Sequence, residues 1–307
     1  MKELRFDDRV AIVTGAGRGM GRAHALLLGR RGAKVVANDI GSEIDGSGSS
    51  ERPAAAVAAE IESEGGSARP SYADISTEEG ARSVVADAIA RFGTIDILVN
   101  NAGILELSPF ADLTAAMLER TMRVNAYGPF YLTRAAWPSL VCQGRGRVVM
   151  IGSGAGAFGM TNRAHYCASK AALVGLTRAL ALEGGDLGIA VNAVFPTAFT
   201  RMTQPATIAR MQRATPTIDI ESANSPEKVS PVVAWLSHDS CTLNGEVLDA
   251  GAGTVSKVFT GVTAGYRTSG DMTIESIAEH LDVIVDEDGY AVPRDLAERL
   301  SGLGFGS

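Results

Sequence analysis

The sequence is poor in the two residue types that most often hold metal ions or covalent cross-links. Its three cysteines stand far apart, and their odd number and irregular spacing fit neither a disulfide framework nor a metal site: Cys142, Cys167 and Cys241. The four histidines form no zinc-ligand pattern: His24, His165, His238 and His280. We therefore expect a protein without a metal, in a reducing compartment.

Positive charge and long apolar runs are scarce as well. The formal net charge is −7, whereas nucleic acids and anionic membranes bind basic surfaces, so we expect neither as a partner. No apolar run approaches the length that spans a bilayer, and the first ten residues, MKELRFDDRV, lack the apolar segment of a signal peptide. These features predict a cytoplasmic protein.

What the sequence has instead is a regular alternation of short apolar runs and longer helical patterns. Runs rich in β-branched residues predict seven buried strands, at 9–14, 34–39, 67–75, 95–100, 147–152, 189–196 and 245–253. Helical patterns lie between them at 20–31, 53–64, 77–91, 114–142, 164–183 and 226–237. This order predicts an α/β fold, in which a doubly wound, Rossmann-like parallel sheet of seven strands carries helices on both faces over residues 1–253.

Three stretches depart from the alternation. Residues 41–53 form a polar connection that is longer than usual and is either a surface insertion or part of a site. Residues 197–226 contain several prolines and follow the carboxyl end of a predicted strand, where we expect a substrate lid. Residues 254–307 suggest short helices with too few apolar residues for a core of their own. We expect this C-terminal extension to pack on the main domain or on another subunit.

A glycine-rich stretch, TGAGRGMG at 14–21, follows the first predicted strand and opens the first predicted helix. Gly15, Gly19 and Gly21 let the chain turn tightly and bring backbone N–H groups against a pyrophosphate. A glycine-rich loop alone is weak evidence, but its position after the first strand predicts a dinucleotide site.

Two charged residues bear on which dinucleotide binds. Asp39 ends the second predicted strand, where a carboxylate accepts hydrogen bonds from the adenosine ribose hydroxyls and repels a 2′-phosphate. Arg18 in the glycine loop acts the other way, because a guanidinium suits phosphate. The repulsion between the Asp39 carboxylate and a 2′-phosphate in close contact costs more free energy than the attraction of the flexible Arg18 recovers. We therefore expect NAD, with NADP the less favoured cofactor.

The motif YCASK places a phenol and an ammonium four residues apart, at Tyr166 and Lys170. On a helix these two side chains lie on the same face. A tyrosine works as a base near neutral pH only if its pKa falls from about 10 by about 2 to 3, and a neighbouring cation favours the phenolate. The alternative is a tyrosine that merely packs, which the order of motifs disfavours.

Two further polar residues complete a candidate catalytic set. Ser153 ends the fifth predicted strand in a glycine-rich turn, where its hydroxyl either holds a substrate oxygen or only shapes the turn. Asn125 interrupts a helical pattern in which asparagine is a poor helix former. It either holds a water beside Lys170 or stabilises a helix kink near Gly128.

With the glycine loop, NNAG at 100–103, Asn125, Ser153 and the Tyr166/Lys170 pair in this order, residues 6–253 resemble the short-chain dehydrogenase/reductase family. The resemblance implies catalytic roles for Asn125, Ser153, Tyr166 and Lys170. It also implies a cofactor cleft formed by Gly15, Arg18, Gly19, Met20, Gly21, Asp39, Asp74, Ile75, Asn101, Gly103, Tyr166 and Lys170. In the family a threonine that meets the nicotinamide amide follows Pro-Gly. Here Thr197 follows Pro196, and Thr200 is the expected contact.

A narrower likeness, to the (3R)-hydroxyacyl-CoA dehydrogenase part of peroxisomal multifunctional enzymes, lies in NDIGSEIDGSGSS, NNAGIL, the stretch 231–253 and the tail. It implies a dimer, and a hydroxyacyl-CoA or hydroxysteroid as substrate. We therefore predict an NAD-dependent oxidoreductase that interconverts a secondary alcohol and a ketone on an apolar substrate, as a homodimer or homotetramer. An NADPH-dependent 3-oxoacyl-carrier-protein reductase and a non-catalytic dinucleotide sensor are the alternatives. We expect the pocket to involve 108–113, 153–165 and the predicted lid, with an apolar lining from Phe158, Met160, Phe199 and Met202.

Overall fold

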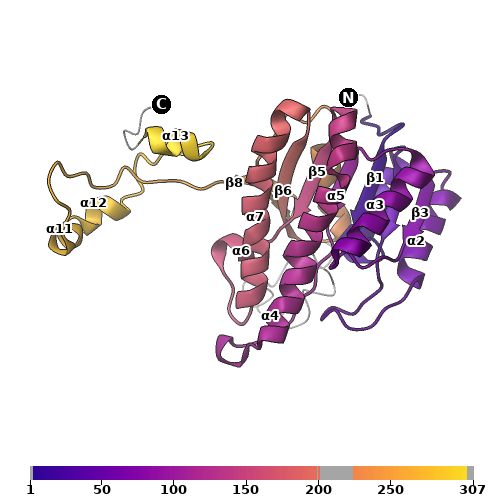
Figure 1. Cartoon of the computed structure of the whole chain (residues 1–307), viewed down its shortest axis with the longest axis horizontal. Helices are drawn as coiled ribbons and strands as arrows, with labels where there is room; N and C mark the ends of the chain where they lie inside the picture. The colour runs from indigo at the N-terminus through magenta and orange to yellow at the C-terminus, as the bar shows by residue number, and fades with distance from the viewer. Residues whose placement is uncertain (1–2, 199, 201–223, 303–307) are drawn as a thin grey trace. The chain divides into compact units, whose positions relative to one another are not determined.

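The computed structural model describes residues 3–198, 200 and 224–302. The chain divides into two compact units, Met1–Lys257 and Val258–Ser307. The first unit contains the sheet and the residues of the predicted site, and it is drawn from indigo to orange in Figure 1. Phe199 and residues 201–223, which hold most of the predicted lid, lie outside the described residues.

The sheet of the first unit has eight strands in the order β3-β2-β1-β4-β5-β6-β7-β8. The strands are β1 (Val10–Thr14), β2 (Lys34–Asn38), β3 (Ser67–Ser71), β4 (Ile97–Asn100), β5 (Arg147–Ile151), β6 (Ala190–Thr197), β7 (Val247–Gly251) and β8 (Thr254–Val258). The neighbours from β3 through β7 pair in parallel. The predicted doubly wound α/β fold is confirmed, with one strand more than expected.

The strands form because their apolar side chains are covered on both sides. All five residues of β1 and all four of β4 are buried, as a parallel sheet between two helical layers requires. Of the two helical layers, α3 (Glu78–Phe92), α5 (Gly128–Gln143) and α7 (Ala164–Gly184) lie together over one face (Figure 1). Contacts join α1 (Gly19–Arg30) with α2 (Arg52–Ser63) and α10 (Ser230–Leu236), which belong to the other layer.

The strand order reverses between β1 and β4. Chain connections leave β1 toward β2 on one side and β4 toward β5 on the other, so their loops diverge at the carboxyl edge. A doubly wound sheet binds ligands in the crevice at this point. The glycine loop follows β1, and the NNAG motif begins at the last residue of β4. The fold therefore brings these two predicted motifs together.

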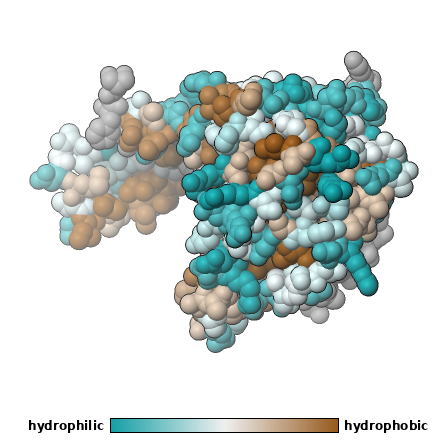
Figure 2. All heavy atoms as spheres, turned by 45° about the vertical axis from the view of Figure 1, so that its right-hand side comes forward, coloured by the Kyte–Doolittle hydropathy of each residue, from teal (hydrophilic) through white to brown (hydrophobic). Residues whose placement is uncertain are grey.

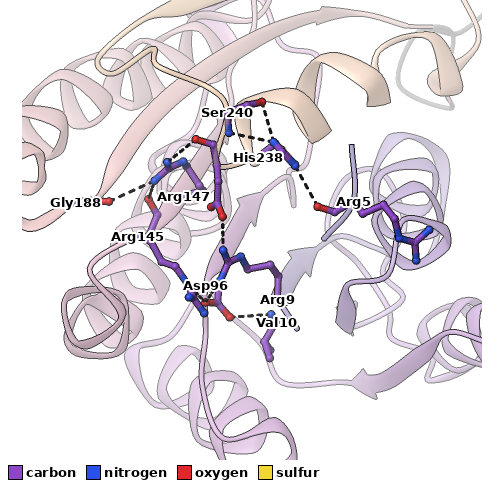
Figure 3. A network of polar contacts seen from close by, with 11 residues as sticks. Arg5, Arg9, Val10, Asp96, Arg145, Arg147, Gly188, His238 and Ser240 are labelled. Carbon is purple, nitrogen blue, oxygen red and sulfur yellow. Dashed lines mark hydrogen bonds and ion pairs between the residues drawn. The ribbon is translucent and has the colours of Figure 1, made fainter. Parts of the chain in front are cut away.

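A buried ionic network ties the opposite, amino ends of the strands (Figure 3). Asp96, which is 1% exposed, accepts a 2.9 Å hydrogen bond from the N–H of Val10 and contacts the guanidinium of Arg145 at 3.2 Å. Arg9 lies 3.7 Å from Asp96 and also pairs with Asp239 on the surface. These contacts lock β1 to β4 at the edge away from the cleft.

Several predicted elements differ from the structure. The eighth strand arises because Ala252 and Gly253 both have positive φ, +50° and +77°, and turn the chain back beside β7. The strand predicted at 67–75 ends at Ser71, and the helix predicted at 226–237 is a 3-10 turn, Pro226–Lys228, followed by α10.

The helix predicted at 114–142 is interrupted. It consists of α4 (Ala115–Met122), a π-helical turn (Arg123–Tyr127) and α5. Asn125 lies in the middle of the π turn, in which Gly128 N–H bonds to the carbonyl of Arg123. A π turn inside a helix is often a functional feature.

The second unit contains α11 (Ile274–Glu279), α12 (Leu281–Val285) and α13 (Leu296–Ser301). Thr273 and Ser276 form a capping box at the start of α11, and Tyr266 stacks on His280 with ring centroids 3.9 Å apart. None of the residues in these three helices is buried, and Ile274 is 83% exposed. The unit has almost no core of its own, which agrees with its short apolar pattern.

Hydrophobic side chains on the surface shown in Figure 2 form separate patches among hydrophilic ones. Among the described helices, none is long and apolar enough to cross a membrane.

Candidate active site

A cavity of about 850 Å³ lies at the carboxyl edge of the sheet. Its walls come from the loops that follow β1, β2, β3, β4, β5 and β6 and from the start of α7. The structure brings into this lining the predicted residues Gly15, Arg18, Gly19, Met20, Gly21, Asp39, Asp74, Ile75, Asn101, Gly103, Ser153, Tyr166, Lys170 and Thr200. Asn125 lies behind the wall, fully buried.

The glycine loop is shaped by close backbone approach. Gly15 has φ +61°, in the left-handed region that favours glycine. A side chain at Gly21 would place its Cβ 2.1 Å from the carbonyl oxygen of Gly15 and 2.5 Å from Nδ2 of Asn101. Both positions therefore require glycine. The first turn of α1 has N–H groups without partners inside the helix, and it begins at Gly19, on the cavity wall.

Thr14 joins the glycine loop to the loop after β4. Its Oγ1 accepts hydrogen bonds of 3.0 Å from the N–H groups of both Asn101 and Ala102. The Asn101 amide in turn donates to the carbonyl of Thr14 at 2.9 Å. Sequence reasoning did not single out Thr14, although a hydroxyl at the end of the first strand, directly before the glycine loop, was visible.

Asp39 is held by two backbone groups. Its Oδ2 accepts a 2.8 Å hydrogen bond from Gly17 N–H and its Oδ1 a 2.6 Å bond from Gly41 N–H. A carboxylate offers about four acceptor positions, so both oxygens can still accept from a ribose hydroxyl. The side chain of Arg18, by contrast, reaches the carbonyl of Ser42 at 3.4 Å.

The long connection at 41–53 folds over the cavity. Leu105 N–H, in the loop after β4, bonds to the carbonyl of Ile44 at 2.9 Å. Because β1 lies between β2 and β4 in the sheet, this bond carries the connection across the glycine loop. Ser42, Ile44 and Gly46 line the cavity. The sequence left open whether 41–53 is a surface insertion or part of a site. The structure favours part of a site.

Asp74, Ile75 and Thr200 lie at separate places on the wall. The carboxylate of Asp74 accepts a 2.9 Å bond from Ser76 N–H, and Ile75 is 5% exposed. The methyl group of Thr200 lies 3.8 Å from where a Cβ of Gly19 would stand. Thr200 is thus beside the glycine loop, whereas its predicted contact with a nicotinamide amide remains a prediction.

The phenol of Tyr166 shares the cavity with Ser153. Burial raises the pKa of Tyr166, while a hydrogen bond with Ser153 and then the positive charge of Arg163 oppose this rise, and Cys167 adds a small increase. The net direction is upward. The sequence argument, which required a lowered pKa, is therefore not met by the protein groups alone, because removal of the phenol from water outweighs its polar neighbours.

Lys170 is a buried ammonium, 4% exposed, whose Nζ donates a 2.8 Å bond to the carbonyl of Ile151. Burial lowers its pKa to about 8. Nζ lies 5.8 Å from the centroid of the Tyr166 ring. The two side chains therefore face each other, as their spacing on one helix predicts.

The amide of Asn125 is occupied by protein partners. Its Oδ1 accepts from Ile104 N–H at 2.8 Å, and its Nδ2 donates to the carbonyl of Ile104 at 3.0 Å and to Ser169 Oγ at 3.2 Å. A Cβ at Gly103 would stand 3.4 Å from both Asn125 Oδ1 and Lys170 Nζ, so the asparagine lies beside the lysine. These contacts agree with the interpretation that Asn125 stabilises a helix kink. Its role in holding a water beside Lys170 stays a prediction.

The apolar part of the cavity is formed in part by the predicted residues. Phe158 and Met160 line it, 73% and 48% exposed, whereas Phe199 and Met202 lie outside the described residues. None of the residues 108–113 is in the lining of the described cavity, so their part in the substrate pocket stays a prediction. Ser108 N–H bonds to the carbonyl of Asn162 at 3.0 Å, and Phe110 is 79% exposed.

The wall fits a dinucleotide. One cavity holds three features that a dinucleotide needs. They are the space beside Gly21 that a Cβ would fill, the fixed carboxylate of Asp39, and the phenol of Tyr166 beside Ser153. Over the same described stretches, no cluster of three or more histidine, cysteine or acidic side chains could hold a metal ion.

Comparison with known proteins adds a family model, described as short chain dehydrogenase, that matches residues 9–210. The peroxisomal multifunctional enzyme type 2 of Mus musculus is 37% identical over 303 residues, which are 98% of this chain and 40% of the mouse protein. The chain thus spans less than half of that relative.

Two solved structures are similar over most of the chain. The full-length peroxisomal multifunctional enzyme type 2 of Drosophila melanogaster has a TM-score of 0.79 at 29% identity, covering 98% of this chain and 49% of the fly chain. A 7α-hydroxysteroid dehydrogenase complexed with NADH and 7-oxo glycochenodeoxycholic acid has a TM-score of 0.74 at 30% identity, covering 82% of this chain and 98% of that chain.

Proposed function

Because this chain belongs to the short-chain dehydrogenase/reductase family, a family of nicotinamide-dependent oxidoreductases, we propose that it oxidises a secondary alcohol to a ketone with NAD, and catalyses the reverse. The observation that carries this proposal is the convergence of Ser153, Tyr166 and Lys170 on a cavity whose other wall is the glycine loop. A proton-handling group and a dinucleotide cradle within one cavity are what such a reaction needs.

The chain would divide the chemistry in the following way. NAD supplies the hydride acceptor when bound, and its positive ring favours the phenolate of Tyr166. Ser153 holds the substrate oxygen, and Tyr166 takes the carbinol proton as a general base. Lys170 stabilises the phenolate by its charge. Asn125 keeps the π turn in place and, with it, the position of Lys170; a water held there would complete a proton path to solvent.

The choice of NAD over NADP rests on Asp39. Its carboxylate is fixed by Gly17 and Gly41 at 2.8 and 2.6 Å, so it cannot easily swing away from a 2′-phosphate. Arg18 is the local feature that supports an NADPH-dependent reductase of 3-oxoacyl chains on a carrier protein, which is the alternative. The 7α-hydroxysteroid dehydrogenase with a similar fold is complexed with NADH.

For the substrate we propose a 3-hydroxyacyl-CoA or a hydroxysteroid. Phe158 and Met160 provide an apolar wall, which suits a fatty acyl chain or a steroid nucleus. The names of the relatives point to both classes, since one is a peroxisomal multifunctional enzyme and the other a hydroxysteroid dehydrogenase.

We further propose two domains, a catalytic domain and a C-terminal extension that packs on the main domain or on a partner subunit in a homodimer or homotetramer. The predicted boundary between 1–253 and 254–307 moves to Lys257, because β8 (Thr254–Val258) belongs to the sheet of the first unit. The exposed apolar side chains of the extension support this packing, with Ile274 and Leu296 83% and 70% exposed. A cytoplasmic location agrees with three free cysteines.

The test is a substrate panel of 3-hydroxyacyl-CoA esters of several chain lengths and of hydroxysteroids, each with NAD or NADP, followed by the absorbance of the reduced nicotinamide. We expect turnover with one of these classes and with NAD. A clear preference for NADPH with 3-oxoacyl carriers would support the reductase instead. Binding of NAD without turnover of any alcohol or ketone would support a sensor.

A further inference from the structure

Asn38, the last residue of β2, is a buried asparagine on the wall of the cavity. It is 2% exposed and stands directly before Asp39. Its amide donates a 3.0 Å hydrogen bond to the carbonyl oxygen of Ala73, and longer ones of 3.4 and 3.5 Å to the hydroxyl and the carbonyl oxygen of Ser71. One buried side chain on β2 therefore holds the end of β3 and the loop that follows it.

The main chain of Asn38 holds the glycine loop at the same time. Its carbonyl oxygen accepts a 3.0 Å hydrogen bond from Ala16 N–H, within the stretch TGAGRGMG. In the sheet, Asn38 lies between Thr14 of β1 and Ser71 of β3, which are its partners in the two parallel ladders. The loops after β1 and β3 are therefore both fixed to this one residue.

The loop after β3 has a second anchor at its far end. The carbonyl oxygen of Asp74 accepts a 3.0 Å hydrogen bond from Thr77 Oγ1, and a Cβ at Gly80 would stand 2.0 Å from the same oxygen. The start of α3 thus lies directly against this carbonyl. Between the two anchors, residues 73–76 line the cavity. Loss of the Asn38 amide would release the loop at the point where it enters the cavity wall.

This part of the wall has the chemistry to recognise an adenine ring. Adenine presents an amino group that donates hydrogen bonds, and the carboxylate of Asp74 is an acceptor on the wall. Hypoxanthine carries a carbonyl oxygen in place of that amino group, so the carboxylate would face a second acceptor. Because a hydrogen bond weakens steeply with distance and angle, such recognition requires that 73–76 stay fixed.

We propose that Asn38 is a positioning residue for the adenine half of the cofactor, which holds 73–76 in register with the glycine loop so that both loops bind one dinucleotide. This inference rests on the proposed function, in which the cavity binds NAD with its adenine against Asp74 and Ile75. Since Asn38 acts through the loop and not on the reacting atoms, its loss weakens cofactor binding and leaves the chemical step unchanged.

The experiment compares the binding of NADH with that of the analogue in which hypoxanthine replaces adenine, followed by the fluorescence of the reduced nicotinamide. The variant is Asn38→Leu, which keeps the shape of the side chain and removes the donor. We expect its Kd for NADH to rise about tenfold, because the bond between Asp74 and the adenine amino group is lost. The Kd for the analogue, which does not form this bond, should rise less than about twofold. At saturating NAD, kcat should stay within about twofold of the natural value.

Asn192→Leu is the matched control. Asn192 is also a buried strand asparagine, 1% exposed on β6, and its amide donates a 2.8 Å hydrogen bond to the carbonyl oxygen of Leu243. It is not in the lining of the cavity. This control should lower the free energy of unfolding, as Asn38→Leu does, and leave both dissociation constants unchanged. If Asn38→Leu does not fold, as judged by circular dichroism, Asn38→Ser takes its place.

Binding measurements keep this inference distinguishable from the proposed function, because NADH binds whether or not an alcohol is turned over. A natural protein that binds neither dinucleotide would contradict the proposed function, and this inference with it. Equal affinity of the natural protein for both dinucleotides would overturn the role of Asn38 alone. So would an Asn38→Leu variant that binds NADH as tightly as the natural protein, or that loses affinity for both dinucleotides equally.

Discussion

The ammonium of Lys170 donates a 2.8 Å hydrogen bond to the carbonyl oxygen of Ile151. Ile151 ends β5, two residues before Ser153, so one strand fixes the cation and carries the hydroxyl. Lys170 is 4% exposed, and its burial lowers the pKa to about 8. The protein thus keeps a desolvated charge at the place where a phenolate would form.

This burial predicts that Lys170 costs stability. Taking the pKa from 10.5 to about 8 corresponds to about 3 kcal/mol against the charged form, which one bond to Ile151 only partly offsets. The free energy of unfolding in urea should therefore be about 1 kcal/mol higher for Lys170→Met than for the natural protein. The variant should lose most of its alcohol oxidation. A variant that is both inactive and less stable would contradict this trade-off.

Asp39 should decide between the two dinucleotides. Asp39→Asn removes the negative charge and keeps one oxygen for Gly17 N–H, while its NH₂ group cannot accept the bond from Gly41 N–H. We expect the ratio of kcat/KM for NAD to that for NADP to fall by about 100-fold, as loss of a close like-charge repulsion allows. Steady-state kinetics with both cofactors measure this ratio.

Arg18→Met is the matched variant for this measurement, because Arg18 is the other charged residue of the loop that could select the cofactor. If Arg18→Met changes the ratio more than Asp39→Asn does, the assignment of NAD selection to Asp39 is wrong.

The parts of the fold and site that were predictable depend on local pattern. The buried runs of β1 and β4 and the glycine loop follow from apolar content and from glycine, because strands covered on both faces and tight phosphate loops demand those residues. The order of motifs also placed Tyr166 and Lys170 on one cavity wall.

The features of the fold and site that the sequence did not predict depend on contacts between residues far apart in the chain. The π turn at 123–127 has no signature in apolar periodicity, since it exists through the bonds of Asn125 to Ile104, 21 residues away. A backbone bond between Leu105 and Ile44 helps to hold 41–53 over the cavity, and a pattern of side chains in the sequence does not reveal such a bond. The upward direction of the Tyr166 pKa reflects burial, which the sequence alone does not show.

His24 should make stability depend on pH. It is 1% exposed on α1, its Nδ1 lies 2.8 Å from Ser230 Oγ, and burial lowers its pKa from 6.5 to about 3. Below about pH 6.5 the unfolded chain takes up a proton that the folded protein refuses. The free energy of unfolding should therefore decrease as the pH falls below about 6.5, by at most about 1.4 kcal/mol per pH unit for this group. The contribution of His24 to stability is fully present above that pH.

His24→Asn keeps an amide near the position of Nδ1 for Ser230 and removes the titrating ring. Urea unfolding at several pH values between 5 and 8 should show a shallower slope for the variant. An equal slope for both proteins would mean that another group, and not His24, carries the acid sensitivity.

Asp96 should contribute far more stability than Asp239, although both pair with Arg9 (Figure 3). Asp96 is 1% exposed and also bonds to Val10 N–H and Arg145, whereas the side chain of Asp239 is 47% exposed. We expect Asp96→Asn to cost about 3 kcal/mol and Asp239→Asn less than about 1 kcal/mol in urea unfolding. Similar losses in the two variants would refute a buried lock between β1 and β4.

The proposed reaction depends on Tyr166 as the group that exchanges the proton of the alcohol. The direct test is the rate of hydride transfer in Tyr166→Phe, measured in a single turnover with saturating NAD and the best alcohol of the panel. The phenylalanine should fill the same space, bind NAD normally and transfer hydride about a thousandfold more slowly. Hydride transfer at the natural rate in this variant would contradict the mechanism.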